Sequence, residues 1–267
     1  MSVASPPNPR HFGVINWIGL GTLCAKEIRR FMKVYTQTLI APVVTTLLFL
    51  AIFTLALGGG TRVVAGVPYA EFLAPGLVMM ALAQNAFANT SSSIIIAKVQ
   101  GNIVDVLMPP LSPFELSLGF IVGGVARGLA VGLVVAVSIA VFVPIQIQHW
   151  PYVIFHALAA ATLLSLLGTI GGVWADKFDH IAAVTNFIVT PLSFLSGTFY
   201  SLDRLPGVWK AIAYANPFFY MIDGFRYGFI GHADGSTEVG IAVMLGANLS
   251  LWWLCQRMFA RGYKLKA

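Results

Sequence analysis

Long uncharged stretches separated by short charged ones are the main pattern in this chain. The first two, 34–61 and 72–97, contain 28 and 26 residues, and about 20 apolar residues suffice for one helix across a bilayer. The 48 uncharged residues of 128–175 are too many for one crossing, and the prolines, tryptophan and polar side chains of 144–151 predict an interfacial turn within them. The pattern predicts six transmembrane helices, at about 36–58, 70–96, 117–143, 152–174, 181–200 and 239–257.

Basic residues indicate how these helices are oriented. Six crossings place both ends of the chain on one side of the membrane. Of the 16 Lys and Arg residues, 11 fall on that side, four on the other and one, Arg127, inside the third predicted span. Positive charge collects on the cytoplasmic side of membrane proteins, so both termini are expected in the cytoplasm.

The composition agrees with a chain dissolved in lipid. Charged residues make up 10% and hydrophobic residues 58%, whereas a soluble domain carries about 25% charged residues; the mean hydropathy is +0.82. The net charge of +6 lies at predicted membrane edges, so membrane lipid and not nucleic acid is its expected partner. We expect an all-α membrane protein with a single transmembrane domain over 1–267, because no repeat or linker divides the chain.

The segment before the first span mixes apolar and charged side chains. Residues 12–33 alternate between the two kinds, which predicts an amphipathic helix in the cytoplasmic interface, so that a tail and this helix occupy 1–33. An ordinary basic flank to the first span is the alternative.

The second predicted span carries polar residues spaced by four. Asn85, Asn89 and Ser93 therefore share one helical face. Polar residues in a span either bond to neighbouring helices or line a pathway, and both interpretations stay open.

The third predicted span contains a ladder of glycines. Small residues at this spacing let helices approach closely in lipid, either within one bundle or between two copies of the chain. Arg127 lies within the ladder, where a charge is costly unless it reaches the interface or faces protein or water. The glycines are Gly119, Gly123, Gly124, Gly128 and Gly132.

The connection between the second and third spans is long and apolar. Asn102–Met108 has helical character, which favours a short helix parallel to the membrane on the cytoplasmic side. A simple connector is the alternative.

The outer segment 200–238 is too rich in aromatic residues for a free loop. Pro217 after Asn216 suits the first turn of a helix, and Asp223 and Arg226 are spaced to pair on it. The segment predicts re-entrant helices before the last span, a conformation that lipid tolerates only against protein or a water-filled cavity.

Sequence templates for catalysis are missing. The chain has no G-x-x-x-x-G-K-[ST] phosphate loop, no H-E-x-x-H and no G-x-S-x-G, and its five histidines and two cysteines lack metal-ligand spacing. It is expected not to be an enzyme and to have no metal or cofactor of its own.

These motifs and their order resemble a known family over nearly the whole chain. AKVQGNIVDVLMPPLSPFEL (97–116), GGVARGLAVG (123–132), TPLSFLSGTFYSLDRLP (190–206) and NPFFYMIDGFRYGF (216–229) are similar to segments of ABC-2 type exporter permeases. These are the integral membrane subunits of bacterial ABC transporters, paired with a separately encoded ATPase.

The resemblance implies an assembly and two groups of site residues. Two permease chains, forming a homodimer in the bacterial inner membrane, would join two ATP-binding subunits that carry ATP and Mg. The segment that couples to the ATPase would include Gly101, Asn102, Asp105, Leu107, Pro110, Ser112, Pro113 and Glu115, with Asp105 and Glu115 as its polar contacts. The outer re-entrant motif would include Asn216, Pro217, Tyr220, Asp223 and Arg226.

The resemblance also implies ATP-driven export of an amphiphilic small molecule, drug, lipid or glycoconjugate. If the polar face of the second span lines the pathway, Asn85, Asn89 and Ser93 are its candidate residues. A membrane scaffold that does not transport is the alternative if there is no partner ATPase. An ion-coupled secondary transporter would need buried carboxylates at mid-membrane and inverted repeats, and neither is visible in the sequence.

Overall fold

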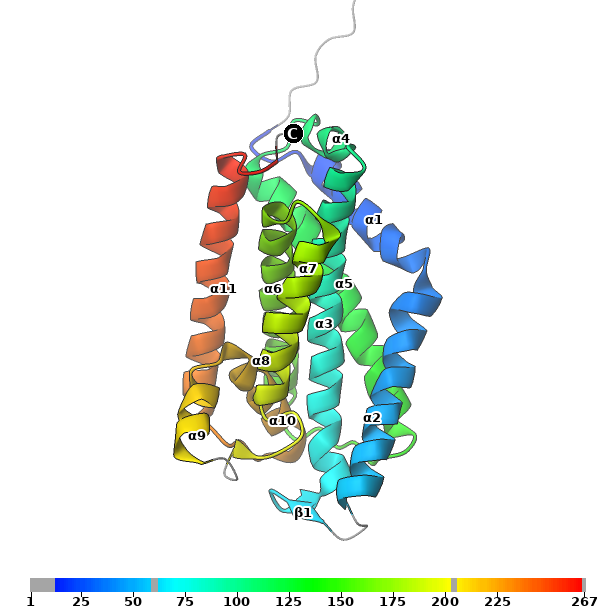
Figure 1. Ribbon diagram of the computed structural model, residues 1–267, viewed down its shortest axis with the longest axis vertical. Coiled ribbons are helices and arrows are strands. Elements are labelled where there is room, and N and C mark those ends of the chain that lie inside the picture. Colours follow the sequence, from blue (N-terminus) through cyan, green and yellow to red (C-terminus); the bar gives the residue numbers. More distant parts are fainter. Residues whose placement is uncertain (1–12, 59–61, 203–205, 266–267) are drawn as a thin grey trace, which may run out of the picture.

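The computed structural model describes residues 13–58, 62–202 and 206–265, mostly as helix (Figure 1). Predictions that involve 1–12, 59–61, 203–205 and 266–267, including the amino-terminal tail, lie outside the described residues. The elements are α1 (Trp17–Met32), η1 (Thr36–Ile40, π-helical), α2 (Ala41–Gly58), β1 (Val63–Val64), β2 (Val67–Pro68), α3 (Tyr69–Val99), α4 (Ile103–Leu107), α5 (Pro113–Ala140), α6 (Trp150–Trp174), α7 (Phe178–Val184), η2 (Thr185–Val189, π-helical), α8 (Thr190–Leu195), α9 (Gly207–Tyr214), α10 (Pro217–Ile230) and α11 (Thr237–Ala260). The two strands form a small antiparallel hairpin.

Five helices in the described part of the chain are long and apolar enough to cross a membrane. They are Thr36–Ala56, Pro113–Ala140, Trp150–Trp174, Phe178–Leu195 and Thr237–Ala260, and they match five of the six predicted spans. The remaining predicted span, 70–96, falls on α3. Its 31 residues reach about 46 Å at 1.5 Å per residue, but the amides and hydroxyls between Gln84 and Ser93 lower its hydropathy. The chain is thus an all-α membrane protein, and the count of six spans stays a prediction.

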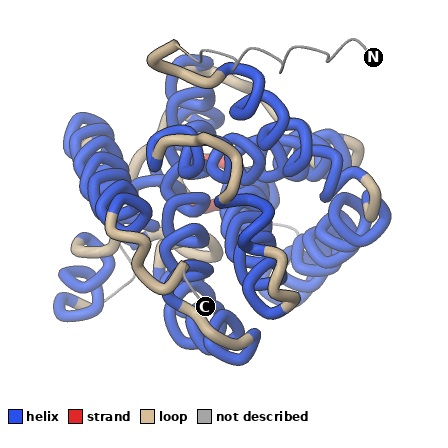
Figure 2. The backbone as a smooth tube through the Cα atoms, turned by 90° about the horizontal axis from the view of Figure 1, so that it is seen from above, coloured by secondary structure: helices blue, strands red, loops and turns tan. Residues whose placement is uncertain are grey.

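The helices form one bundle around α3, which packs against α2, α5, α6 and α10. Figure 1 shows α2 and the continuous helix α7–η2–α8 on either side of α3, with α11 beyond α6. Seen from above, the long helices run nearly parallel to one another (Figure 2). The segment α1, the short helix α4 and the end of α11 lie at one end of the bundle, and the hairpin, α9 and α10 lie at the other.

The glycine ladder of α5 faces the inside of this bundle. A Cβ atom on Gly124 would lie 2.4 Å from Ser165 Oγ of α6, and one on Gly128 would lie 2.9 Å from Ala86 Cβ of α3. Gly119 is similarly close to α1. These close approaches confirm packing within one chain as the role of the ladder.

Burial is uneven across the bundle. In the most apolar 18-residue stretch of α6, 56% of the residues are buried within the chain. In the corresponding stretches of Thr36–Ala56 and Phe178–Leu195, only 11% of the residues are buried. The two helices that flank α3 therefore leave most of their surface open to lipid or to another protein.

Candidate functional site

The polar residues predicted on the second span lie on one face of α3, and each bonds to a neighbouring helix. Asn85 Oδ1 accepts from Arg127 Nη2 of α5 at 2.9 Å. Asn89 Oδ1 accepts from Arg30 Nη2 of α1, also at 2.9 Å. Ser93 Oγ donates to Glu27 Oε1 of α1 at 2.8 Å. Bonding between helices, one of the two interpretations left open, is confirmed for all three. Asn85 also lines two cavities.

Glu27 is the charged residue of α1 that the structure buries completely. Besides Ser93, its carboxylate lies 3.3 Å from Arg30 Nε and 3.5 Å from Lys26 Nζ. A Cβ atom on Gly123 would lie 2.4 Å from Glu27 Cβ, so the ladder makes room for this carboxylate. The prediction of an interfacial amphipathic helix missed this contact, although the spacing of Glu27 and Arg30 on one helical face was a local signal of pairing.

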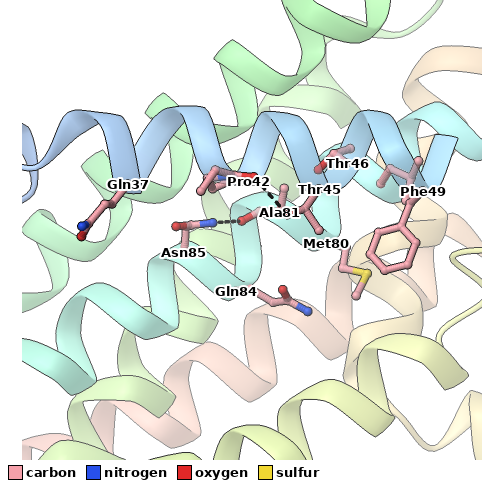
Figure 3. Close-up of a pocket in the computed structure, with 11 residues that line it drawn as sticks. Gln37, Pro42, Thr45, Thr46, Phe49, Met80, Ala81, Gln84 and Asn85 are labelled. Carbon is pink, nitrogen blue, oxygen red and sulfur yellow. Dashed lines mark hydrogen bonds between the residues drawn. The ribbon is translucent and has the colours of Figure 1, made fainter. Parts of the chain in front are cut away.

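Two adjoining cavities open on either side of the polar face of α3, and Gln84 and Asn85 line both. The first, about 280 Å³, lies between α2 and α3 (Figure 3). The second, about 370 Å³, lies between α3 and the helix α7–η2–α8. We call the two together the α3 cleft. Its polar lining residues are Gln37, Thr45, Thr46, Gln84, Asn85, Ser91, Ser92, Thr185 and Thr190.

Both helices that border the α3 cleft contain a π-helical turn. Gln37 lies in η1 and Thr185 begins η2, and each side chain faces the cleft. A π-turn adds a residue within a helix and occurs often at functional sites. Hydropathy cannot reveal these turns, because it reports how apolar a residue is and not which carbonyl its backbone N–H bonds.

The predicted coupling segment forms a short helix and a capped turn at the α1 end of the bundle. The chain turns out of α3 at Gly101, whose φ of +75° lies in the left-handed region that favours glycine. The helix α4 follows, and Asn102 and Asp105 are exposed there. Ser112 then caps α5 through a reciprocal pair of bonds with Glu115. Pro113 is at the first helical position, Leu107 is half-buried, and Pro110 is exposed.

Glu115 has a different place from the one predicted. Its side chain is 3% exposed, and its carboxylate accepts hydrogen bonds from the backbone N–H groups of Ser112 and Asn16. Asn16 Nδ2 also donates to Pro110 O at 3.3 Å. A buried carboxylate with these internal partners does not present itself to another subunit, and it instead ties the coupling segment to α1. Asp105 is exposed, and its role as an outward contact stays a prediction.

The outer motif holds α10 against the rest of the bundle. Asn216 caps α10 by accepting from Phe218 N at 3.0 Å, and its Nδ2 donates to Leu192 O of α8. Pro217 is the first residue of α10, and Tyr220 is 8% exposed. The break predicted at Asn216-Pro217 is confirmed.

The predicted pairing of Asp223 with Arg226 is wrong. Asp223 accepts from the backbone N–H groups of Asp234 and Gly235 at 2.8 and 3.0 Å. Arg226 is 1% exposed and donates to Gly197 O at 2.6 Å, with its guanidinium 4.0 Å from the centre of the Phe72 ring. Each side chain has partners on another segment, which i,i+3 spacing along one helix cannot indicate.

Among the described residues, no three His, Cys, Asp or Glu side chains gather as a metal site would need. The described residues thus form three features: the polar α3 cleft, the arginines Arg30 and Arg127 bonded to α3, and the exposed segment around α4 at one end of the bundle.

Comparisons with known proteins agree with the motifs. Residues 19–230 match the family described as ABC-2 type transporter. The chain is 40% identical over 251 residues to the inner membrane transport permease YadH of Escherichia coli K12, covering 94% of this chain and 98% of YadH. It is 24% identical over 254 residues to nodulation protein J of Rhizobium leguminosarum bv. viciae, covering 91% and 92% of the two chains. The chain therefore belongs to the ABC-2 type transporter family, as a multi-pass permease of the bacterial inner membrane.

Proposed function

We propose that this permease is the membrane subunit of an ATP-driven exporter for an amphiphilic small molecule, drug, lipid or glycoconjugate. In this proposal α3 also crosses the membrane, which brings the number of spans to six, and both termini lie in the cytoplasm. The observation that carries it is the α3 cleft, a row of amides and hydroxyls between two helices that are only 11% buried. Polar side chains at membrane depth are costly against lipid and commonly mark a pathway.

A second copy of the chain would close this cleft. Two clefts facing each other would enclose one polar pathway and cover the exposed apolar surfaces of α2 and α7–η2–α8. Val44, Leu48, Phe187 and Ile188 are among the large apolar side chains exposed there. Each copy would bind one ATP-binding subunit, which supplies ATP and Mg.

The coupling segment around α4 supplies the surface for that ATPase. Asp105 and Asn102 are exposed on it, and Glu115 and Asn16 anchor it to α1. The helix α1 reaches in turn to the cleft wall, since Arg30 Nη1 lies 3.2 Å from Ser92 Oγ. Movement of the coupling segment would therefore reach the cleft through α1.

The test is co-purification with the ATP-binding protein encoded beside this gene, followed by ATPase assays in lipid nanodiscs. We expect a complex of two chains of each kind whose ATP hydrolysis falls at least tenfold when Asp105 and Asn102 are both replaced by alanine. As a control, Ser250→Ala changes an exposed hydroxyl on α11 far from α4 and should leave hydrolysis unchanged. A monodisperse permease that binds no ATPase under these conditions would instead support the scaffold alternative.

A further inference from the structure

Two guanidinium groups and one carboxylate lie at the junction of α1, α3 and α5. Arg30 and Arg127 bond to Asn89 and Asn85, one turn apart on the same face of α3. Arg30 is paired with Glu27, which also bonds Lys26 and Ser93. In the described part of the chain Arg127 has no ion-pair partner, and its side chain donates to the neutral amide of Asn85. We call this the junction cluster.

Two buried donors of the junction cluster also lack an acceptor. Arg127 Nε and Asn89 Nδ2 have no hydrogen-bond partner within the described chain, and Asn89 is fully buried. A Cβ atom on Gly123 would lie 3.3 Å from Asn89 Nδ2, which places this amide against α5, one turn before Arg127. Both orphan atoms are donors, so the group that would satisfy them is an acceptor.

The position of the junction cluster makes its excess charge expensive. Asn85 lies near the middle of α3, at a depth where a cation without a counter-charge is strongly disfavoured. Arg30 retains 28% side-chain exposure and Arg127 is half-buried, so both guanidiniums can be reached from outside the bundle. The donors of an arginine fork match the oxygen geometry of phosphate and carboxylate groups, which they can bind with two parallel hydrogen bonds.

From this geometry we propose that the junction cluster binds the anionic headgroup of an amphiphile, a phosphate, sulfate or carboxylate, through Arg127 and Arg30. The ligand is either a membrane lipid held in place or the transported molecule, since the chemistry of the headgroup is the same. The inference does not require ATP-driven transport, because binding can be measured on the permease alone.

The test uses the full chain in phosphatidylcholine nanodiscs, with dodecyl phosphate as probe and dodecyl maltoside as a neutral amphiphile with the same alkyl chain. We expect dodecyl phosphate to bind at least tenfold more tightly than dodecyl maltoside. Arg127→Gln should weaken dodecyl phosphate about tenfold, as loss of one charged hydrogen bond predicts, and should leave dodecyl maltoside unchanged. Arg127→Lys should weaken the binding of dodecyl phosphate by a smaller factor, because the positive charge remains.

A second variant separates binding from folding. Asn85→Asp places a carboxylate where Asn85 Oδ1 now accepts from Arg127, so it supplies the missing counter-charge within the chain. We expect it to preserve the unfolding temperature and yet to weaken dodecyl phosphate binding about tenfold. Arg257→Gln is the matched control, because it removes a guanidinium that lies on the Trp253 ring of α11. It should leave the affinity for dodecyl phosphate unchanged.

Nanodiscs that contain phosphatidylglycerol identify the source of the headgroup. If this lipid competes with dodecyl phosphate in an Arg127-dependent way, the site holds a membrane lipid; if dodecyl phosphate still binds, the site favours a free amphiphile. The proposal is overturned if Arg127→Gln and Asn85→Asp are both folded and bind dodecyl phosphate as the native chain does. That result would leave the exporter proposal standing, since ATPase binding is measured separately.

Discussion

The backbone N–H of Asn16 donates a hydrogen bond to the carboxylate of Glu115, 99 residues further along the chain. The same carboxylate caps α5 through Ser112. One buried side chain thus joins the start of α1, the end of the coupling segment and the first turn of α5. The contact ties the segment around α4 to the start of α1.

Glu115→Ala should therefore impair both folding and coupling. Loss of the cap, and of the acceptor for the backbone N–H groups of Asn16 and Ser112, should lower the free energy of unfolding by about 2 kcal/mol, measured as a lower unfolding temperature in detergent. Asp105→Ala changes an exposed residue of α4 and should shift stability by less than about 0.5 kcal/mol, while ATP-dependent transport falls. Equal effects of the two variants on stability would contradict these separate roles.

Substitution of Glu27 should lower the free energy of unfolding more than substitution of its neighbour Lys26. Glu27→Gln removes a fully buried carboxylate from its contacts with Arg30 and Ser93, and the loss of a hydrogen bond to a charged group costs about 1.5–3 kcal/mol. Lys26 is 48% exposed, so Lys26→Gln should cost less than about 1 kcal/mol. Unfolding in denaturant measures both, and a native-like Glu27→Gln protein would show that the Arg30 contact contributes nothing.

Gly123→Ala should loosen α1 from α5. The added methyl would lie 2.4 Å from Glu27 Cβ, and overpacking of this kind costs about 1–3 kcal/mol. Gly246→Ala makes the same change in α11, where nothing lies within 4 Å, and helix propensity favours alanine there. We expect a lower unfolding temperature for the first variant only, and an unchanged Gly123→Ala protein would refute the close approach.

Gln84→Leu should block transport without unfolding the chain. Gln84 lines both cavities of the α3 cleft and is half-buried, so leucine removes polarity from the pathway at little cost to packing. Ser250→Leu makes a comparable change on the exposed face of α11. Transport assays in proteoliposomes should show a loss for Gln84→Leu and native rates for Ser250→Leu; the reverse ranking would remove the α3 cleft from the pathway.

The contact between Asp176 and Lys264 should depend on pH. A 2.6 Å hydrogen bond from Lys264 lowers the pKa of the Asp176 carboxyl below its ordinary value. A group whose pKa is lowered by folding stabilises the native state above its unfolded pKa, and the effect is lost as the pH falls through the folded one. The unfolding temperature of Asp176→Asn should therefore lie slightly below that of the native chain at pH 7. The two should converge well below about pH 4, and a gap that persists there would exclude this mechanism.

Several features of this permease follow from local sequence. Runs of apolar residues are as long as the bilayer requires, and they located the five helices that are long and apolar enough to span it within the described part of the chain. Asn216 and Pro217 act on the first turn of the helix that they begin, so the start of α10 was predictable. The glycine ladder was also visible, because four-residue spacing alone puts small residues on one face.

Tertiary structure decided which partners the polar residues have. Spacing suggested that Asp223 would pair with Arg226, but each found stronger partners on another segment. Glu115 appeared to be an outward contact and is buried against Asn16, while Glu27 appeared to lie at the membrane surface and is buried beside Gly123. Periodicity along a helix determines which residues share a face; it does not determine which helix packs on that face, and a buried charge takes its partner from that neighbouring helix.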